Sequence, residues 1–160
     1  MIGVISDTHD NVSNVIKSIK IFENAEVDFI MHCGDIISPA TARFFRGIHT
    51  KAVKGNCDGD VENLKKAFED IHGEFFEDIC EMDISGKKIL AYHGQDTLRL
   101  QSFVDNQGYD YILTGHTHKC RDEKIGKTRI INPGSHYYGG ENKVVLLDVI
   151  NDKVDFIEVN

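Results

Sequence analysis

The chain lacks several features that would place it outside the ordinary globular proteins. No apolar run approaches the roughly 20 residues that a membrane-spanning helix requires. No basic segment precedes the apolar run at residues 2–5 and no cleavage site follows it, so a cytoplasmic location is the expectation. No repeat, low-complexity tract or linker divides the 160 residues, which predicts one domain over residues 1–160.

Positive charge is also scarce. The 18 Lys and Arg residues are outnumbered by 26 Asp and Glu residues, which gives a net charge of −8. Proteins that bind nucleic acids usually carry basic surface, so a nucleic-acid partner is not expected. Divalent cations bound to acidic residues would nevertheless make a site far less negative than this balance suggests.

Closely spaced cysteine pairs are missing. The four cysteines stand at positions 33, 57, 80 and 120, and no two have CxxC spacing. Because nothing indicates secretion, reduced thiols are favoured over disulfides. Cys33 and Cys80 end apolar stretches and are expected to behave as small buried hydrophobic residues.

Strand–loop–helix units recur through the first half of the chain. Apolar runs predict strands at residues 2–6, 27–32 and 51–54, and helical spacing predicts helices at 12–24, 39–46 and 61–70. Asn11 or Ser13 could cap the first helix, while Ser38 and Pro39 suit the start of the second. Such a series predicts a parallel sheet with functional loops at the carboxyl ends of its strands.

The second half of the chain has a different pattern. Residues 79–84 and 87–92 are strand-like and are joined by Ser-Gly, which predicts a hairpin. A helix at 96–106, a strand at 109–114 and hairpins around Gly126 and around residues 151–152 follow. The fold class is therefore α/β, with one mixed sheet or two packed sheets.

Five short motifs of potential metal ligands each follow one of these apolar runs. They are SDTHD with Asp7 and His9, CGD with Asp35, GNCD with Asn56, YHG with His93, and GHTH with His116 and His118. Carboxylate, imidazole and amide ligands suit Mn²⁺, Fe²⁺, Ni²⁺ and Zn²⁺. A shared carboxylate can hold two such ions roughly 4 Å apart, an arrangement suited to phosphoryl transfer to water.

Each motif alone also has an ordinary structural interpretation. Asp7 and His9 could belong to a helix-capping loop, Asp35 and Asn56 to turns, and His93 to a hydrogen bond. The GHTH motif is the most specific, because two histidines at i,i+2 directly after an apolar strand are unusual as surface residues. The occurrence of all five motifs in series favours a dinuclear metal site.

In this order the motifs resemble those of the calcineurin-like metallophosphoesterase superfamily, in particular its small YfcE-like phosphodiesterase branch. The similarity extends from SDTHDN near the start of the chain to NPGS at residues 132–135. The resemblance implies a four-layer α/β/β/α sandwich, in which two mixed sheets pack face to face with helices outside.

The resemblance also implies two groups of ligands and one bridge. Asp35 would bridge the two ions, while one ion would be held by Asp7, His9 and His118 and the other by Asn56, His93 and His116. Mn²⁺ is the first expectation for both ions, with Ni²⁺, Fe²⁺ or Zn²⁺ as alternatives.

The implied reaction is hydrolysis of a small phosphodiester by in-line attack of a metal-bridged hydroxide. The expected catalytic residues are Asp35, Asn56, Cys57 and His93. Cys57 departs from the family's pattern, because many members have a histidine there that protonates the leaving group or contacts phosphate. A thiol with an ordinary pKa near about 8.5 is a weaker match for that proton transfer, so efficient cleavage of poor leaving groups is not expected.

Two alternative functions keep the same fold. Non-catalytic interaction scaffolds of the superfamily tend to lose site histidines, whereas all seven ligands are present here. Nuclease relatives add a DNA-binding domain, for which this chain has neither room nor obvious basic stripes. We expect no membrane partner, and the family suggests a homodimer.

Some further histidines and arginines stay outside the expected site. His32 is expected to pack within its strand, and His49 and His72 to lie in solvated loops. Arg99 and Arg121 have the fork geometry for a phosphate, but such arginines are more often solvated and neither is assigned. His136, which follows NPGS, is likewise unassigned.

Overall fold

Two mixed β-sheets form the middle of the fold in the computed structural model, which describes residues 1–160. The first sheet contains, in spatial order, β11 (Lys153–Glu158), β10 (Lys143–Asp148), β1 (Ile2–Ile5), β2 (Phe29–His32), β3 (Thr50–Val53) and β4 (Glu74–Phe76). The second contains β5 (Ile79–Ile84), β6 (Lys87–Tyr92), β7 (Tyr111–Leu113), β9 (Thr128–Pro133) and β8 (Cys120–Ile125).

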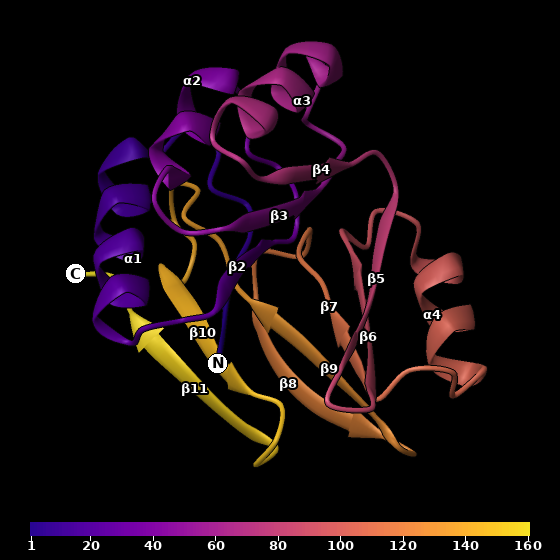
Figure 1. Ribbon diagram of the computed structural model, residues 1–160. Helices are drawn as coiled ribbons and strands as arrows, with labels where there is room; N and C mark the ends of the chain where they lie inside the picture. The colour runs from indigo at the N-terminus through magenta and orange to yellow at the C-terminus, as the bar shows by residue number, and fades with distance from the viewer.

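Helices cover the outer face of each sheet. They are α1 (Val12–Asn24), α2 (Pro39–Ala42), the 3₁₀ helix η1 (Arg43–Phe45), α3 (Val61–Asp70) and α4 (Thr97–Asp105). Figure 1 shows α1, α2 and α3 outside the first sheet and α4 outside the second. The predicted α/β/β/α order of layers is therefore confirmed. No helix has the length and apolar character that crossing a membrane requires.

Strand direction brings the motif-bearing loops to common edges. In the first sheet β1, β2, β3 and β4 are parallel, and only β10 and β11 run antiparallel to their neighbours. In the second sheet β6, β7 and β9 are parallel, with antiparallel strands β5 and β8 at the edges. The carboxyl ends of parallel neighbours lie at the same edge of a sheet, where ligand-binding loops gather in α/β folds.

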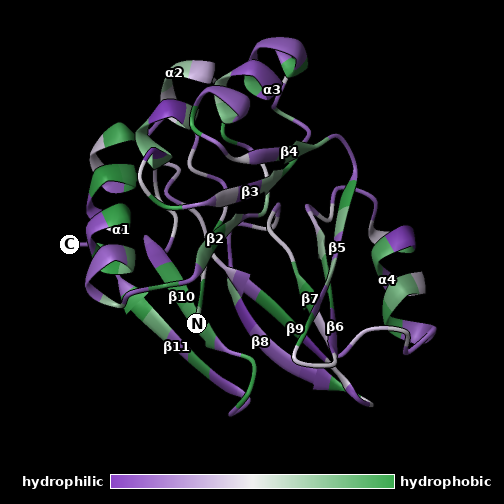
Figure 2. Ribbon diagram, viewed as in Figure 1, coloured by the Kyte–Doolittle hydropathy of each residue, from purple (hydrophilic) through white to green (hydrophobic).

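The core consists of three apolar layers, which follow from the alternation of side chains along the strands. In β1, Ile2 and Val4 face the second sheet, while Ile5 packs toward the first group of helices. In β6, Ile89 packs between the sheets and Leu90 packs toward α4. The helices in Figure 2 show the matching stripes, with hydrophobic residues on one side and hydrophilic residues on the other.

Two residues expected to cap helices do so in the structure. The Asn11 side chain accepts a hydrogen bond from the Asn14 amide at 3.2 Å, and α1 has the predicted bounds. Ser38 caps α2 by accepting from the Thr41 amide at 3.3 Å. These side chains satisfy amide donors that the first turn of a helix leaves unpaired.

Two details of the predicted elements were wrong. The helix predicted at residues 39–46 ends as an α-helix at Ala42 and continues as η1, whose tighter turn buries Phe45 before Gly47 reverses the chain at a φ of 107°. Strand β4 was missed, because three residues at a sheet edge show no alternation to read.

Candidate metal centre

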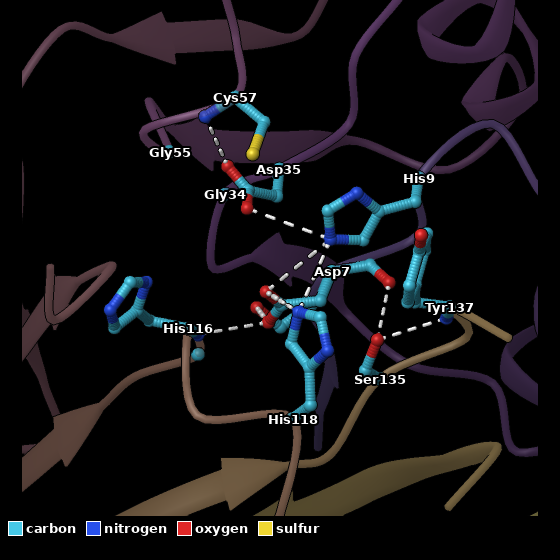
Figure 3. Close-up of polar contacts among 12 residues, drawn as sticks. Asp7, His9, Gly34, Asp35, Gly55, Cys57, His116, His118, Ser135 and Tyr137 are labelled. Carbon is cyan, nitrogen blue, oxygen red and sulfur yellow. Dashed lines mark hydrogen bonds and ion pairs between the residues drawn. The ribbon is translucent and has the colours of Figure 1, made fainter. Parts of the chain in front are cut away.

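All seven predicted ligands lie around one point between the carboxyl ends of the two sheets (Figure 3 shows five of them). The first three motifs follow β1, β2 and β3, and the last two follow β6 and β7. The carboxylates of Asp7 and Asp35 and the ring of His93 are buried, whereas Asn56 and Cys57 are exposed. The centre therefore has a buried, charged floor and an opening beside the GNCD loop.

One group of ligand atoms is compact enough to hold an ion. Donor atoms of Asp7, His9, Asp35 and His118 all lie within 4.8 Å of one another. The Asp7 Oδ2 atom accepts hydrogen bonds from the Ser6 hydroxyl and the His116 amide, at 2.5 and 3.0 Å. Its Oδ1 atom is buried without any hydrogen-bond partner and lies 3.2 Å from His118 Nε2.

An unpartnered buried carboxylate oxygen costs free energy unless a cation lies beside it. The unpartnered Asp7 Oδ1 is therefore better explained as a metal-binding atom than as part of a purely structural side chain. The Asp7 carboxylate also raises the pKa of His9, an effect that burial only partly offsets. This half of the centre attracts positive charge.

The second group is built around the side-chain oxygen of Asn56. That oxygen lies 3.0 Å from His93 Nε2 and 2.9 Å from His116 Nδ1. The other ring nitrogen of His93 lies 2.7 Å from the Cys33 carbonyl oxygen, to which it must donate its proton. In the neutral ring Nε2 is then an acceptor that faces another acceptor, so a proton or a cation is needed between His93 and Asn56.

Asp35 lies between the two groups. Its Oδ2 atom is 3.6 Å from His9 Nε2 on one side and 3.5 Å from His93 Nε2 on the other. Its Oδ1 atom accepts a hydrogen bond from the Cys57 amide at 2.8 Å. Burial opposes ionisation, but the contacts with His93 and Cys57 outweigh it and hold the pKa of the Asp35 carboxyl well below its usual range.

The backbone of the centre is unusual. Five of the seven predicted ligands have the left-handed conformation, with φ between 43° for His9 and 67° for His116: Asp7, His9, Asp35, His116 and His118. Residues other than glycine seldom adopt it, and it persists where surrounding structure fixes the chain. The short turns after the strands therefore place ligand side chains at a conformational cost.

Close approach explains two of the motif glycines. A Cβ atom on Gly55 would lie 2.1 Å from Asp35 Oδ1, and one on Gly115 would lie 2.5 Å from Asp7 Oδ2. Both distances are far shorter than a van der Waals contact, so a larger residue at either position would displace a predicted ligand. The glycines of GNCD and GHTH let neighbouring loops reach the carboxylates.

Asp58, the last residue of the GNCD motif, connects two of the motif loops. Its buried carboxylate accepts hydrogen bonds from four backbone amides, those of Asp35, Ile36, Ile37 and Gly55, at 2.8–3.0 Å. These bonds join the loop after β2 to the loop after β3 and hold Ile37 at a φ of 85°. The only signal in the sequence was the final Asp of GNCD.

The NPGS segment holds two of the motif loops in place. The side-chain Nδ2 of Asn132 donates to the Gly115 carbonyl at 2.7 Å, within the GHTH motif. The Ser135 hydroxyl and the His136 amide both donate to the Asp7 carbonyl at 3.0 Å. This segment therefore positions ligands without providing any.

The remaining polar candidates are occupied elsewhere. Arg99 pairs with Asp78 through both arms of its guanidinium, at 2.6 Å each, and Arg121 pairs with Glu123. The ring of His136 is buried and contacts the Lys143 carbonyl rather than a ligand side chain. His49 and His72 are exposed and His32 is buried in its strand, as expected.

Two packed sheets with helices outside, and polar motifs at the strand ends, are the features of the metallophosphoesterase class of folds. The chain belongs to the calcineurin-like phosphoesterase superfamily, since that family's sequence model matches residues 1–152. The expected family is therefore confirmed, and membership makes the chain a hydrolase of phosphate esters.

Relatives of similar sequence agree with this assignment. A phosphodiesterase of Methanocaldococcus jannaschii is 32% identical over 163 aligned positions, covering 99% of this chain and 97% of the relative. A probable metallophosphoesterase of Bacillus subtilis, YsnB, is 30% identical and covers 82% of this chain and 72% of its own.

Solved structures show the same fold. An archaeal phosphodiesterase superposes with a TM-score of 0.90 at 30% identity, over 98% of both chains. The phosphoesterase Yfce of Escherichia coli gives 0.72 at 16% identity over 99% of both chains. A Vps29 of Entamoeba histolytica, solved with Zn²⁺, gives 0.63 at 19% identity over 99% of both chains.

Proposed function

We propose that this chain is a divalent-metal-dependent phosphodiesterase with a dinuclear centre. The observation that carries the proposal is the position of Asp35, whose Oδ2 atom lies between His9 of one ligand group and His93 of the other. A carboxylate shared in this way is the ligand that two ions acting on one phosphate require. The 32% identical relative named as a phosphodiesterase supports the same reaction.

Asp7, His9 and His118 would hold one ion, and Asn56, His93 and His116 the other. When bound, such ions supply Lewis acidity toward a phosphate oxygen and lower the pKa of water near it. The chain itself fixes the ligands. The Cys33 carbonyl holds the His93 tautomer that leaves Nε2 free for metal, and the Cys57 amide restrains the Asp35 carboxylate.

Asp35, Asn56 and His93 of the predicted catalytic set keep their place in this proposal, and Cys57 is given a positioning role instead. Burial and the nearby Asp35 carboxylate raise the pKa of the Cys57 thiol to about 11. A thiol with that pKa stays neutral near pH 7 and is a poor proton donor to a leaving group. We therefore assign Cys57 to the centre through its backbone amide and expect a preference for activated esters.

Mn²⁺ is proposed as the native ion, with Ni²⁺, Fe²⁺ or Zn²⁺ as alternatives that the same donors accept. A small phosphodiester is proposed as the substrate rather than nucleic acid, because the net charge is −8. One domain over residues 1–160, a homodimer and a cytoplasmic location complete the proposal.

The test is a panel of substrates and metals on purified protein. Bis(p-nitrophenyl) phosphate, p-nitrophenyl phosphate and single- and double-stranded DNA are each assayed with Mn²⁺, Ni²⁺, Fe²⁺ and Zn²⁺. We expect hydrolysis of the diester with Mn²⁺ or Ni²⁺. Asp35→Asn should lower kcat/KM at least ~100-fold, because even residues that only support metal ligands contribute ~10–100-fold.

Asp105→Asn is the matched control, since Asp105 is exposed on α4 and contacts only Gln101 through its side chain. It should leave activity unchanged. A metal-loaded protein that hydrolyses none of these substrates would contradict the proposal. Low metal content under the same conditions would instead favour a non-catalytic scaffold.

A further inference from the structure

Tyr137 lies against two of the predicted metal ligands. The centroid of its ring is 4.8 Å from that of His9 and 5.7 Å from that of His118, with the ring planes tilted by 59° and 50°. Figure 3 shows the tyrosine ring at the side of the centre where these two histidines lie. His116 lies on the opposite side in that view, so Tyr137 forms one boundary of the centre.

The loop that carries Tyr137 is tied to the centre by its backbone. The Tyr137 amide donates to the Ser135 hydroxyl at 2.9 Å, and that hydroxyl donates to the Asp7 carbonyl. The Gly140 amide donates a hydrogen bond to the Tyr137 carbonyl at 2.8 Å, and the Asn142 amide donates one to the Ser135 carbonyl at 3.1 Å. The position of the ring is therefore coupled to the loop that holds Asp7.

Much of the Tyr137 ring is not packed against the rest of the protein. Tyr137 is 51% exposed, and its hydroxyl makes no hydrogen bond within the protein. Support of His9 and His118 alone would favour a buried, fully packed side chain, because aromatic rings contribute mainly through the area they bury. A half-exposed ring beside a metal centre is instead available to a bound substrate.

We propose that Tyr137 is a specificity-determining residue that contacts a planar group on the non-departing arm of the phosphodiester. This inference rests on the proposed function and names its substrate class, diesters with an aryl or nucleobase-bearing arm. A planar group gains from offset stacking or edge contact with a tyrosine ring, and a methyl group gains little. The phosphate would lie at the ligands, and its planar arm would lie on Tyr137.

Two substrates with the same leaving group test this role. Bis(p-nitrophenyl) phosphate and methyl p-nitrophenyl phosphate both release p-nitrophenolate and differ only in the arm that stays. Tyr137→Leu should lower kcat/KM for the bis-aryl diester about 10-fold, chiefly through KM, and leave the methyl diester within about twofold. Tyr137→Phe keeps the ring and should keep the selectivity.

Tyr138→Leu is the control, because Tyr138 is 98% exposed and its ring contacts no other aromatic side chain. It should change neither substrate. If Tyr137→Leu slows both diesters equally, the ring only supports His9 and His118 and the proposal is overturned. If neither diester is affected, it is also overturned.

A binding measurement separates this inference from the proposed function. Calorimetry of Mn²⁺-loaded protein with phenylphosphonate and methylphosphonate needs no turnover. The wild type should bind phenylphosphonate more tightly, and Tyr137→Leu should remove that preference. Equal affinity for the two probes in the wild type would refute the role of Tyr137, whereas absence of hydrolysis with the preference intact would refute only the proposed reaction.

Discussion

The two halves of the centre are built differently. The half around Asp7 contains a buried anion, and all three of its own ligands, Asp7, His9 and His118, have left-handed backbone. The half around Asn56 contains a neutral, exposed amide, and only His116 has that backbone conformation. The first half thus combines negative charge with a strained backbone at every one of its ligands. The second half has a neutral, exposed ligand at Asn56 and a strained backbone only at His116.

Hydrogen bonding sharpens the difference. Asp7 Oδ1 has no hydrogen-bond partner and its nearest imidazole nitrogen is 3.2 Å away, whereas the Asn56 oxygen lies within 3.0 Å of two imidazole nitrogens. The nearby carboxylates raise the pKa of His9 and that of His93 despite burial, so without metal an imidazole of either half can be protonated. We infer that the half around Asp7 binds its ion more tightly.

The largest expected effect comes from breaking one half at a time. Asp7→Asn keeps the shape but removes the charge, and should lower metal affinity by at least ~100-fold, so that the protein loses both ions on desalting. Asn56→Ala should lose only the ion of its own half. Metal content by mass spectrometry after desalting measures both, with Asp105→Asn as the control for charge. Equal loss in the two variants would remove the proposed asymmetry.

Asp58 offers a test of how the halves are joined. Asp58→Asn replaces an acceptor of four amide hydrogen bonds by a side chain with only one acceptor oxygen. We expect kcat/KM to fall ~10–100-fold, as for other residues that orient metal ligands. The free energy of unfolding should fall by about 1–3 kcal/mol.

Excess Mn²⁺ should restore part of the Asp58→Asn activity, because the ligands themselves remain. Urea denaturation and activity at several Mn²⁺ concentrations measure both effects. Loss of stability with unchanged metal dependence would mean that Asp58 only stabilises the fold.

A smaller effect concerns pH and the side of the centre near Asp7. Burial lowers the pKa of His32 to about 3 and that of His136 to about 4. In the unfolded chain both histidines titrate near about 6.5, so the unfolded state binds more protons between that pH and the folded pKa values. Stability of the metal-free protein should therefore fall as pH drops below about 6.5, by ~1.4 kcal/mol per pH unit for each histidine.

Urea denaturation of metal-free protein at pH 7 and pH 5 measures this slope. His136→Asn should reduce it, and His72→Asn, at an exposed position, should not. If the urea concentration at the unfolding midpoint is the same at pH 7 and pH 5, neither His32 nor His136 is buried in its neutral form.

Most elements and the gathering of the predicted ligands could be anticipated because each motif is a local signal. Apolar runs that end in short polar motifs located Asp7, Asp35 and Asn56, and Asn11 and Ser38 marked helix starts correctly. The hairpin after β5 followed from Ser85 and Gly86, which adopt φ values of 53° and 76°.

The rest depends on contacts between segments far apart in the chain. The role of Asp58 requires amides from a loop more than 20 residues away, and no local pattern encodes such a set. Tyr137 reaches His9 only because residues 134–136 pack against the loop after β1. Strand β4 exists because an edge of the sheet is available beside β3.

Anomalous diffraction from a crystal grown with Mn²⁺ tests the central claim most directly. We predict two manganese peaks on either side of Asp35, one bounded by Asp7, His9 and His118 and the other by Asn56, His93 and His116. At limiting Mn²⁺ the peak beside Asp7 should be the stronger. A single peak, or peaks that Asp35 does not contact, would contradict the account.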